Sequence, residues 1–246
     1  MKQLFDVSGK TILITGASRG IGKSLALGFR DAGAKVFGTG TSESSISWME
    51  SESIHGRVGD FTKDDVSRDL IGSIKKEHGK LDVLINNAGI SSHTPISMMK
   101  DDEMNRIIDI NFKGVFRMCQ AYYKTHKHEG GTIINISSVL GLTGFTLASV
   151  YSGTKGAVIQ MSKAMVAEWG SKFRINVICP GFIETEMTEN MQGKGNLMEE
   201  FNSRIPMRRM GKPEELLGAA IFLASDASSY MTASTLVIDG GMTGTV

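Results

Sequence analysis

The feature that most constrains the fold of this chain is its alternation of short, β-branched apolar runs with longer stretches of helical periodicity. Near-continuous apolar strands separated by helices are typical of a parallel sheet that is covered on both faces. Right-handed crossovers then predict a doubly wound α/β sheet with ligands at the carboxyl ends of its strands. The predicted strands are Thr11–Thr15, Lys35–Thr39, His55–Gly59, Val83–Asn86, Thr132–Ile136, Arg174–Cys179 and Thr235–Ile238. The predicted helices are Ile21–Ala32, Lys63–His78, Asp101–His126, Tyr151–Ser171 and Pro213–Ser225.

Length and charge narrow the class of protein further. The 246 residues predict a single domain spanning 1–246, and the net charge of +1 gives no general attraction to nucleic acid or to an anionic membrane. Two cysteines, Cys119 and Cys179, offer neither a disulfide framework nor metal-ligand spacing, so we expect no metal. Because no signal-peptide core or membrane-length apolar run is visible, we expect a cytoplasmic protein.

A glycine-rich segment follows the first predicted strand and opens the first predicted helix. Its glycines, Gly16, Gly20 and Gly22, permit a tight turn and a close backbone approach, while the helix N-terminus offers free N–H groups to a pyrophosphate. The spacing is G-x-x-x-G-x-G rather than G-x-G-x-x-G. We therefore predict nucleotide binding here, the alternative being a glycine turn without a ligand.

The end of the second predicted strand bears on which dinucleotide binds. A carboxylate at this position would accept a hydrogen bond from the ribose 2′-hydroxyl of NAD, but the segment Gly38–Ser42 carries hydroxyls, including Thr41, and no acid. With Arg19 in the glycine loop, the segment suits a 2′-phosphate and predicts NADP(H). In the alternative, Arg19 is solvated and Glu43 binds the ribose.

The residues Ser138, Tyr151 and Lys155 form the candidate catalytic set. Tyr151 and Lys155 are one turn apart on the same helix face, and Ser138 follows a predicted strand. A phenol has a pKa of about 10, so a cation in a desolvated cleft is needed to bring it near 7. We expect Lys155 to supply that cation, so that Tyr151 exchanges a proton with a substrate oxygen while Ser138 hydrogen-bonds the same oxygen. In the alternative, the Tyr-x-x-x-Lys pair lies on a solvated helix face and has no catalytic role.

Other polar positions gather at the same predicted edge. Asp60 follows the third strand, as a candidate adenine contact or a turn residue, and Asn86–Gly89 closes the fourth strand. Asn111 is a mid-helix asparagine, which indicates a specific hydrogen bond. Residues 180–185, Pro-Gly-Phe-Ile-Glu-Thr, reach the cleft edge and could bind a carboxamide or form only a turn. His93 is expected to be a solvated loop residue rather than a catalytic one.

Taken in order and at the correct spacing, these motifs resemble the short-chain dehydrogenase/reductase family over essentially the whole chain. The resemblance implies a Rossmann-type, seven-stranded sheet and hydride transfer with a nicotinamide cofactor. It implies that Tyr151 is the general acid/base, that Lys155 lowers its pKa and holds a ribose, that Ser138 orients the substrate, and that Asn111 supports a relay water. The cofactor-binding residues expected on this basis are Gly16, Ser18, Arg19, Gly20, Ile21, Gly22, Thr41, Asp60, Phe61, Asn87, Ala88, Gly89, Tyr151, Lys155, Pro180, Gly181, Ile183 and Thr185.

Within the family, the chain is most similar to bacterial 3-oxoacyl-acyl-carrier-protein reductases, which act in fatty-acid synthesis with NADPH. Their carrier docking relies on basic residues, yet this chain has His128–Gly130 before the fifth strand, and only Lys172 and Arg174 remain near the sixth. An acyl-thioester substrate is therefore expected, with acyl carrier protein as a possible partner. The alternatives are a short-chain dehydrogenase acting on a sugar, polyol or other small ketone, and a non-catalytic NADP-binding sensor.

Two further expectations concern a lid and the assembly. The segment at about 184–212 lies outside the alternation, and we expect it to be a substrate lid with a hinge at Gly193 and Gly195. Its methionines, which suit an apolar ligand, are Met187, Met191, Met198, Met207 and Met210. The predicted helix 151–171 carries a wide apolar surface, so we expect a homo-oligomer, a tetramer as in the family, rather than coverage by the helix 101–126 alone.

Overall fold

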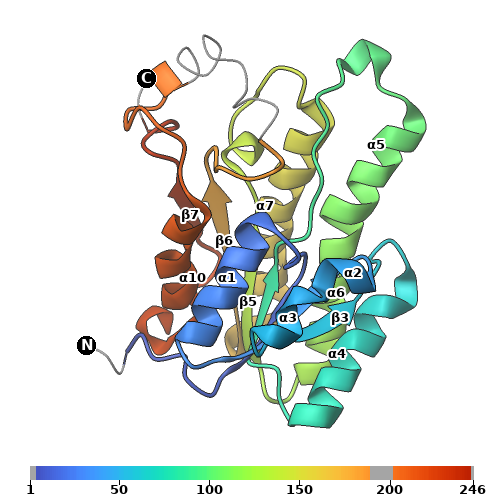
Figure 1. Ribbon diagram of the computed structural model, residues 1–246, viewed down its shortest axis with the longest axis vertical. Helices are drawn as coiled ribbons and strands as arrows, with labels where there is room; N and C mark the ends of the chain where they lie inside the picture. Colours follow the sequence, from blue (N-terminus) through green and yellow to red (C-terminus); the bar gives the residue numbers. More distant parts are fainter. Residues whose placement is uncertain (1–3, 189–201, 245–246) are drawn as a thin grey trace.

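A seven-stranded parallel sheet forms the centre of the computed structural model, which describes residues 4–188 and 202–244 (Figure 1). The strand order is β3-β2-β1-β4-β5-β6-β7. The strands are β1 (Thr11–Ile14), β2 (Lys35–Gly40), β3 (His55–Val58), β4 (Val83–Asn86), β5 (Gly131–Ile136), β6 (Phe173–Pro180) and β7 (Thr235–Ile238). The predicted doubly wound, Rossmann-type α/β fold is confirmed.

The helices connect successive strands and cover the sheet. The α-helices are α1 (Gly20–Asp31), α2 (Glu43–Ile46), α3 (Trp48–Ser51), α4 (Asp64–His78), α5 (Asp101–Ile108), α6 (Val115–His126), α7 (Ser149–Trp169) and α10 (Leu217–Ala224). The 3₁₀ turns are η1 (Ile96–Met98), η3 (Val139–Gly141), η4 (Gly170–Lys172), η5 (Pro213–Leu216) and η6 (Asp226–Ser228), and η2 (Asp109–Gly114) is a π-helical turn.

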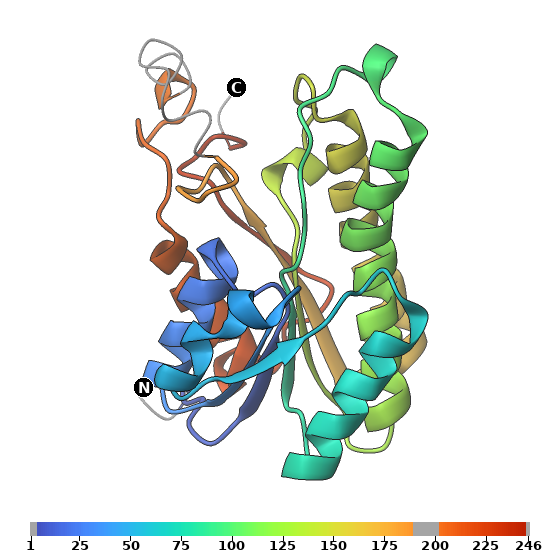
Figure 2. The same ribbon diagram turned by 45° about the vertical axis from the view of Figure 1, so that its right-hand side comes forward.

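The alternation of side chains along the strands divides the core into two layers. Ile12 and Ile14 of β1 face the cluster formed with α1 and α10, whereas Leu13 faces the cluster formed with α4, α6 and α7. Figure 2 shows these two groups of helices on opposite sides of the sheet. The central strands β1 and β4 therefore bury both of their faces, which explains why their sequences read as continuous apolar runs, whereas the edge strands β3 and β7 are more exposed.

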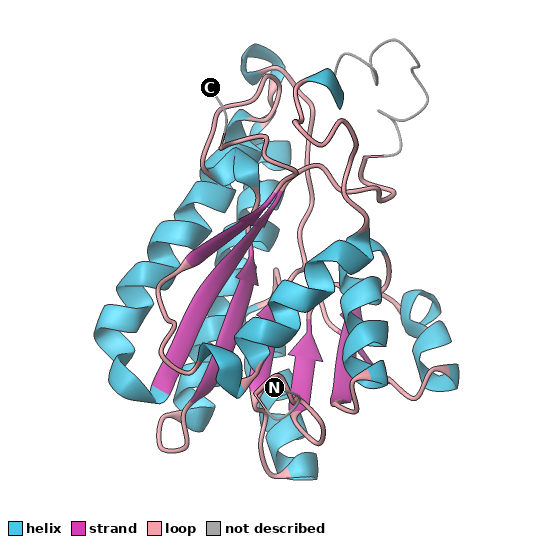
Figure 3. Ribbon diagram, turned by 90° about the vertical axis from the view of Figure 1, so that its left-hand side faces the viewer, coloured by secondary structure: helices cyan, strands magenta, loops and turns pink. Residues whose placement is uncertain are grey.

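The crevice that a doubly wound sheet offers to a ligand lies above β1 and β4. These two strands are neighbours, with Leu13 opposite Leu84, although the chain leaves them towards opposite edges of the sheet. Connecting loops gather beyond the carboxyl ends of the strands (Figure 3). This is the topological switch point at which such folds bind ligands.

The predicted boundaries differ from the observed ones mainly where tertiary contacts decide the local structure. The predicted helix 101–126 is helical throughout, but η2 interrupts its α-helical geometry around Asn111. Two short helices, α2 and α3, were missed because a single turn carries no periodic signal. The predicted helix 213–225 begins as a 3₁₀ turn with Pro213 at its first position.

Part of the wide apolar surface of α7 is covered within the chain, as the alternative interpretation expected. Val158, Ile159 and Met165 are buried, and Trp169 stacks on Tyr123 of α6 with ring centroids 4.6 Å apart. The homotetramer therefore stays a prediction. Among the described residues, no helix has the length and apolar character required to cross a membrane.

Candidate active site

The glycine-rich loop between β1 and α1 is held by contacts that only glycine permits. Gly16 adopts a left-handed φ of +64°, and a Cβ there would lie 2.8 Å from Cα of Ala88. At Gly22 a Cβ would collide with the Gly16 carbonyl oxygen and approach Asn87 Nδ2 to 2.5 Å. The loop is therefore drawn tightly against the end of β4, which leaves its outer side open at the N-terminus of α1.

Hydrogen bonds from neighbouring strands fix this loop. Asn87 Nδ2 donates to the carbonyl oxygens of Thr15 and Gly16, each at 3.0 Å. The Thr15 hydroxyl accepts the N–H groups of Asn87 and Ala88, and the Thr39 hydroxyl accepts the Gly16 N–H at 3.1 Å. The Asn87 side chain thus clamps the loop, in addition to lining the cleft described next.

A cleft of about 560 Å³ runs from this loop to the phenol of Tyr151, and we call it the large cleft. Most of the residues predicted to bind the cofactor line it, but Gly22 is buried beneath it and Pro180, Gly181 and Ile183 line the adjoining cavity instead. The predicted residues at the large cleft are Gly16, Ser18, Arg19, Gly20, Ile21, Thr41, Asp60, Phe61, Asn87, Ala88, Gly89, Tyr151, Lys155 and Thr185.

The end of the large cleft beside β2 carries a cation, and no acidic residue of β2 lines it. Arg19 is exposed at the start of α1 and lines the cleft together with Thr41. Glu43, which would bind the ribose in the alternative interpretation, begins α2 and does not line the cleft. Asp60 lines it but is also a turn residue, because its carboxylate accepts the Thr62 hydroxyl at 2.7 Å, which lowers the pKa of Asp60.

The three candidate catalytic side chains meet at the carboxyl ends of β5 and β6. Ser138 leaves β5 and begins η3, where its hydroxyl accepts the Leu140 N–H at 3.1 Å. A Cβ on Gly141 would lie 2.8 Å from the Lys155 carbonyl carbon, so η3 turns back directly against α7. This close approach brings Ser138 to Tyr151, and the predicted convergence of the two residues is confirmed by their shared cavity.

Lys155 is buried below Tyr151 and is oriented by the end of β5. Its ammonium donates to the Ile136 carbonyl oxygen at 2.9 Å and lies 5.7 Å from the centre of the Tyr151 ring. The Ser137 hydroxyl donates to the Lys155 carbonyl oxygen at 2.8 Å, which ties the same turn of α7 to β5. Sequence reasoning missed Ser137, whose only signal was its position between the strand and Ser138.

Desolvation shifts the pKa values of both members of this pair. Desolvation raises the pKa of the Tyr151 phenol, an effect that the hydrogen bond with Ser138 only partly offsets. Desolvation also lowers the pKa of Lys155 to about 8. The role of Lys155 in lowering the pKa of Tyr151 stays a prediction for the complex with the oxidised cofactor, whose positive charge would add to that of the ammonium; in the protein alone, desolvation raises the pKa of the phenol.

Asn111 reaches the site through the loop that follows β4. Within η2 it is fully buried, and its amide accepts the Ile90 N–H at 2.9 Å and donates to the Ile90 carbonyl oxygen at 2.8 Å. The same Nδ2 approaches the Thr154 hydroxyl on α7 at 3.3 Å. Asn111 therefore joins this loop to the first turns of α7, and the mid-helix hydrogen bond predicted for it is confirmed.

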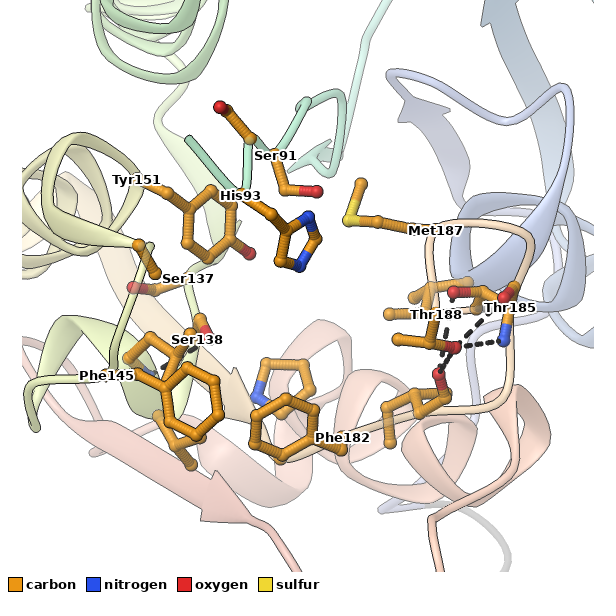
Figure 4. A pocket seen from close by; sticks show the side chains of 18 residues that line it. Ser91, His93, Ser137, Ser138, Phe145, Tyr151, Phe182, Thr185, Met187 and Thr188 are labelled. Atoms are coloured by element: carbon orange, nitrogen blue, oxygen red, sulfur yellow. Dashed lines mark hydrogen bonds between the residues drawn. The ribbon is translucent and has the colours of Figure 1, made fainter. Parts of the chain in front are cut away.

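A second, smaller cavity of about 110 Å³ adjoins the large cleft, and we call it the apolar cavity. Ser138 and Tyr151 lie on one side of it, and Phe145 and Phe182 form its wall with ring centroids 5.6 Å apart (Figure 4). Sequence reasoning missed both phenylalanines, although Phe145 lies within the stretch that joins Ser138 to Tyr151. Their positions depend on two loops that only the fold brings together.

The described part of the predicted lid is anchored to the body of the protein. Residues 189–201, which include Met191, Met198, Gly193 and Gly195, lie outside the described residues. Met187 lines both the large cleft and the apolar cavity, whereas Met210 is buried. Arg209 Nη2 lies 2.6 Å from Glu215 Oε1, and this ion pair holds the C-terminal part of the predicted lid to η5.

A glycine loop at the switch point of a doubly wound sheet, beside a half-buried phenol and a buried ammonium, defines a nucleotide-dependent α/β enzyme. Residues 16–243 match a family model described as Enoyl-(Acyl carrier protein) reductase. The chain belongs to the short-chain dehydrogenase/reductase family of NAD(P)-dependent oxidoreductases.

Similar proteins cover nearly the full length of the chain. The 3-oxoacyl-(acyl-carrier-protein) reductase FabG of Thermotoga maritima is 38% identical over 244 residues, which are 96% of this chain and 98% of that protein. The gluconate 5-dehydrogenase of Gluconobacter oxydans is 37% identical over 248 residues, 98% and 97% of the two chains. The crystal structure of a gluconate 5-dehydrogenase from Burkholderia cenocepacia, in complex with NADP and tartrate, superposes with a TM-score of 0.94 at 33% identity and covers 99% of each chain.

The depressed pKa of Lys155 predicts a dependence of stability on pH. Because the unfolded chain holds this proton up to about pH 10.5 and the folded chain only up to about 8, folding becomes more favourable as pH rises between these values. Relative to Lys155→Met, the free energy of unfolding of the wild type should rise by about 3 kcal/mol across this range. Urea unfolding at several pH values measures it, and a constant difference between the two proteins contradicts the assigned burial.

Proposed function

We propose that the protein reduces a 3-oxoacyl thioester to the 3-hydroxyacyl thioester with NADPH, as in fatty-acid synthesis. The observation that carries this proposal is the lining of the apolar cavity. Among the described residues it contains the two phenylalanine rings and no aspartate, glutamate, lysine or arginine. Such a wall suits an acyl chain, whereas a sugar acid needs several convergent charged or amide groups.

The residues of the large cleft fit a dinucleotide. The glycine cradle leaves backbone N–H groups at the start of α1 for a pyrophosphate, and added Cβ atoms at Gly16 or Gly22 would displace the loop by collision with Ala88 or Asn87. Arg19 and Thr41 would hold a 2′-phosphate, and Lys155 would hold the nicotinamide ribose. When bound, NADPH supplies the hydride that reduces the ketone carbon.

The chain itself supplies the proton and the orientation. Ser138 and the Tyr151 phenol would hydrogen-bond the ketone oxygen, and Tyr151 would donate its proton to that oxygen as it gains negative charge. A raised phenol pKa keeps Tyr151 protonated in the protein alone, which is the form that a reduction requires. Lys155, close beneath the ring, would then stabilise the phenolate left behind, and we assign to Asn111 the support of the water that returns the proton.

Carrier-bound substrate has less support than a free thioester. His128–Gly130 and Lys172 precede β5 and β6. They therefore lie at the amino ends of these strands, whereas the site lies at the carboxyl ends. Glu129 is paired with Lys75 at 2.8 Å, and the half-buried Arg174 donates to carbonyl and hydroxyl oxygens, including Leu223 O at 2.8 Å. Arg174 is thus a structural residue, and we retain acyl carrier protein only as a possible partner of a cytoplasmic homotetramer.

Reduction or oxidation of a sugar acid is the second candidate function. It is favoured by the likeness to the two gluconate 5-dehydrogenases, whose identities are 37% and 33%. The apolar wall of the cavity is the feature that separates the two candidates.

Arg19 should determine the preference for NADPH. A charge-assisted contact to the 2′-phosphate contributes about 1.5–3 kcal/mol, so the wild type should prefer NADPH over NADH by roughly 10- to 150-fold in kcat/KM. Arg19→Ala should remove most of that ratio, whereas Arg68→Ala, on the exposed face of α4, should leave it unchanged. Equal kcat/KM for the two cofactors in the wild type contradicts the assignment.

A substrate comparison tests the proposed function directly. NADPH consumption should be faster with an acetoacetyl thioester than with 5-ketogluconate at equal concentration. Phe145→Ala should lower kcat/KM for the thioester by about tenfold through lost apolar contact, while Leu142→Ala, on an exposed residue outside the cavity, should not. Turnover of the sugar acid without turnover of any thioester establishes the second function instead.

A further inference from the structure

His93 is an exposed loop residue, as its sequence context indicated, and it also faces the reacting end of the apolar cavity. It lines the cavity that also contains Ser138 and Tyr151. In Figure 4 its imidazole points into the cavity from the side opposite Phe145 and Phe182, near Tyr151 and Met187. Among the residues that line the cavity in the described structure, His93 is the only one with an imidazole, and none has a carboxylate, ammonium or guanidinium.

The loop that carries His93 is fixed on both sides of this residue. On the N-terminal side, Asn111 holds both backbone polar groups of Ile90. Around His93 itself, the hydroxyls of Ser92 and Thr94 both donate to Glu103 of α5, the second at 2.8 Å. These two hydrogen bonds lower the pKa of Glu103, which favours the ionised carboxylate that accepts them. The position of the His93 backbone is therefore set by its neighbours, while the side chain stays exposed to solvent.

Most of the other side-chain hydroxyls around the cavity already make hydrogen bonds within the protein or are assigned to the substrate ketone. The Thr188 hydroxyl donates to the Ile183 carbonyl oxygen at 2.7 Å, and Ser92 donates to Glu103. Ser138 and Tyr151 are assigned to the ketone oxygen. No described residue hydrogen-bonds the His93 ring, which therefore offers an uncommitted N–H to a ligand.

We propose that His93 recognises the second oxygen of the substrate, the thioester carbonyl that a single methylene separates from the reacting ketone. This inference rests on the proposed 3-oxoacyl thioester substrate and adds the residue that selects it over simple ketones. A hydrogen bond from the His93 N–H stabilises the complex of a substrate that has this oxygen and contributes nothing to one that lacks it. His93 is a specificity-determining residue and takes no part in proton transfer.

The test compares two substrates that differ only at that oxygen. One is acetoacetyl-N-acetylcysteamine, and the other is its thioether analogue, in which a methylene replaces the thioester carbonyl. His93→Leu should lower kcat/KM for the thioester by about tenfold and leave that for the analogue within about twofold. His93→Gln, which keeps an N–H donor, should recover much of the loss. His128→Leu, on an exposed residue that precedes the amino end of β5, should change neither value.

The outcomes separate this inference from the proposed function. If the wild type reduces the thioester and His93→Leu does so with the same kcat/KM, the role of His93 is overturned and the proposed function stands. An equal fall for both substrates also overturns it, because a general disturbance of the cavity would act on both. A wild type that reduces ketones but no 3-oxoacyl thioester overturns the proposed function and this inference together.

Discussion

The burial of one ammonium group, that of Lys155, is the constraint on which the site depends. A buried cation must have its donors satisfied, and the Ile136 carbonyl oxygen at the end of β5 provides an acceptor at 2.9 Å. That bond fixes α7 against the sheet, and Ser137 reinforces it from the same strand end. Space above the ammonium is kept open by Gly89, where a Cβ would lie 3.4 Å from Lys155 Nζ.

This arrangement gives the site its electrostatic character. Both members of the Tyr151–Lys155 pair are desolvated, so the neutral phenol is favoured while the ammonium is held less strongly than in water. A phenol whose pKa is raised and an ammonium group whose pKa is lowered therefore lie close together before any substrate enters. The arrangement is ready to stabilise negative charge that appears on a substrate oxygen, which is the requirement of carbonyl reduction.

Much of the fold and the position of the site could be predicted from the sequence, because both follow from local patterns. The alternation of strands and helices indicated the doubly wound sheet, and the spacing of Tyr151 and Lys155 placed them on one helix face. The pKa of Tyr151 could not be predicted, because it depends on burial by residues distant in the sequence. The position of His93 at the cavity was missed for a similar reason, since the loop that carries it is held by hydrogen bonds from Ser92 and Thr94 to Glu103 of α5.

The most direct test of this account is the turnover of Tyr151→Phe, which removes the transferable proton and keeps the ring. With an acetoacetyl thioester and NADPH, kcat should fall by about 10²–10⁴-fold, while the dissociation constant for NADPH, followed by its fluorescence, stays within about threefold. Tyr123→Phe, on a tyrosine that stacks on Trp169 away from both cavities, should keep full activity. A purified, folded Tyr151→Phe that retains more than about half of the wild-type turnover contradicts the role of Tyr151 as the proton donor.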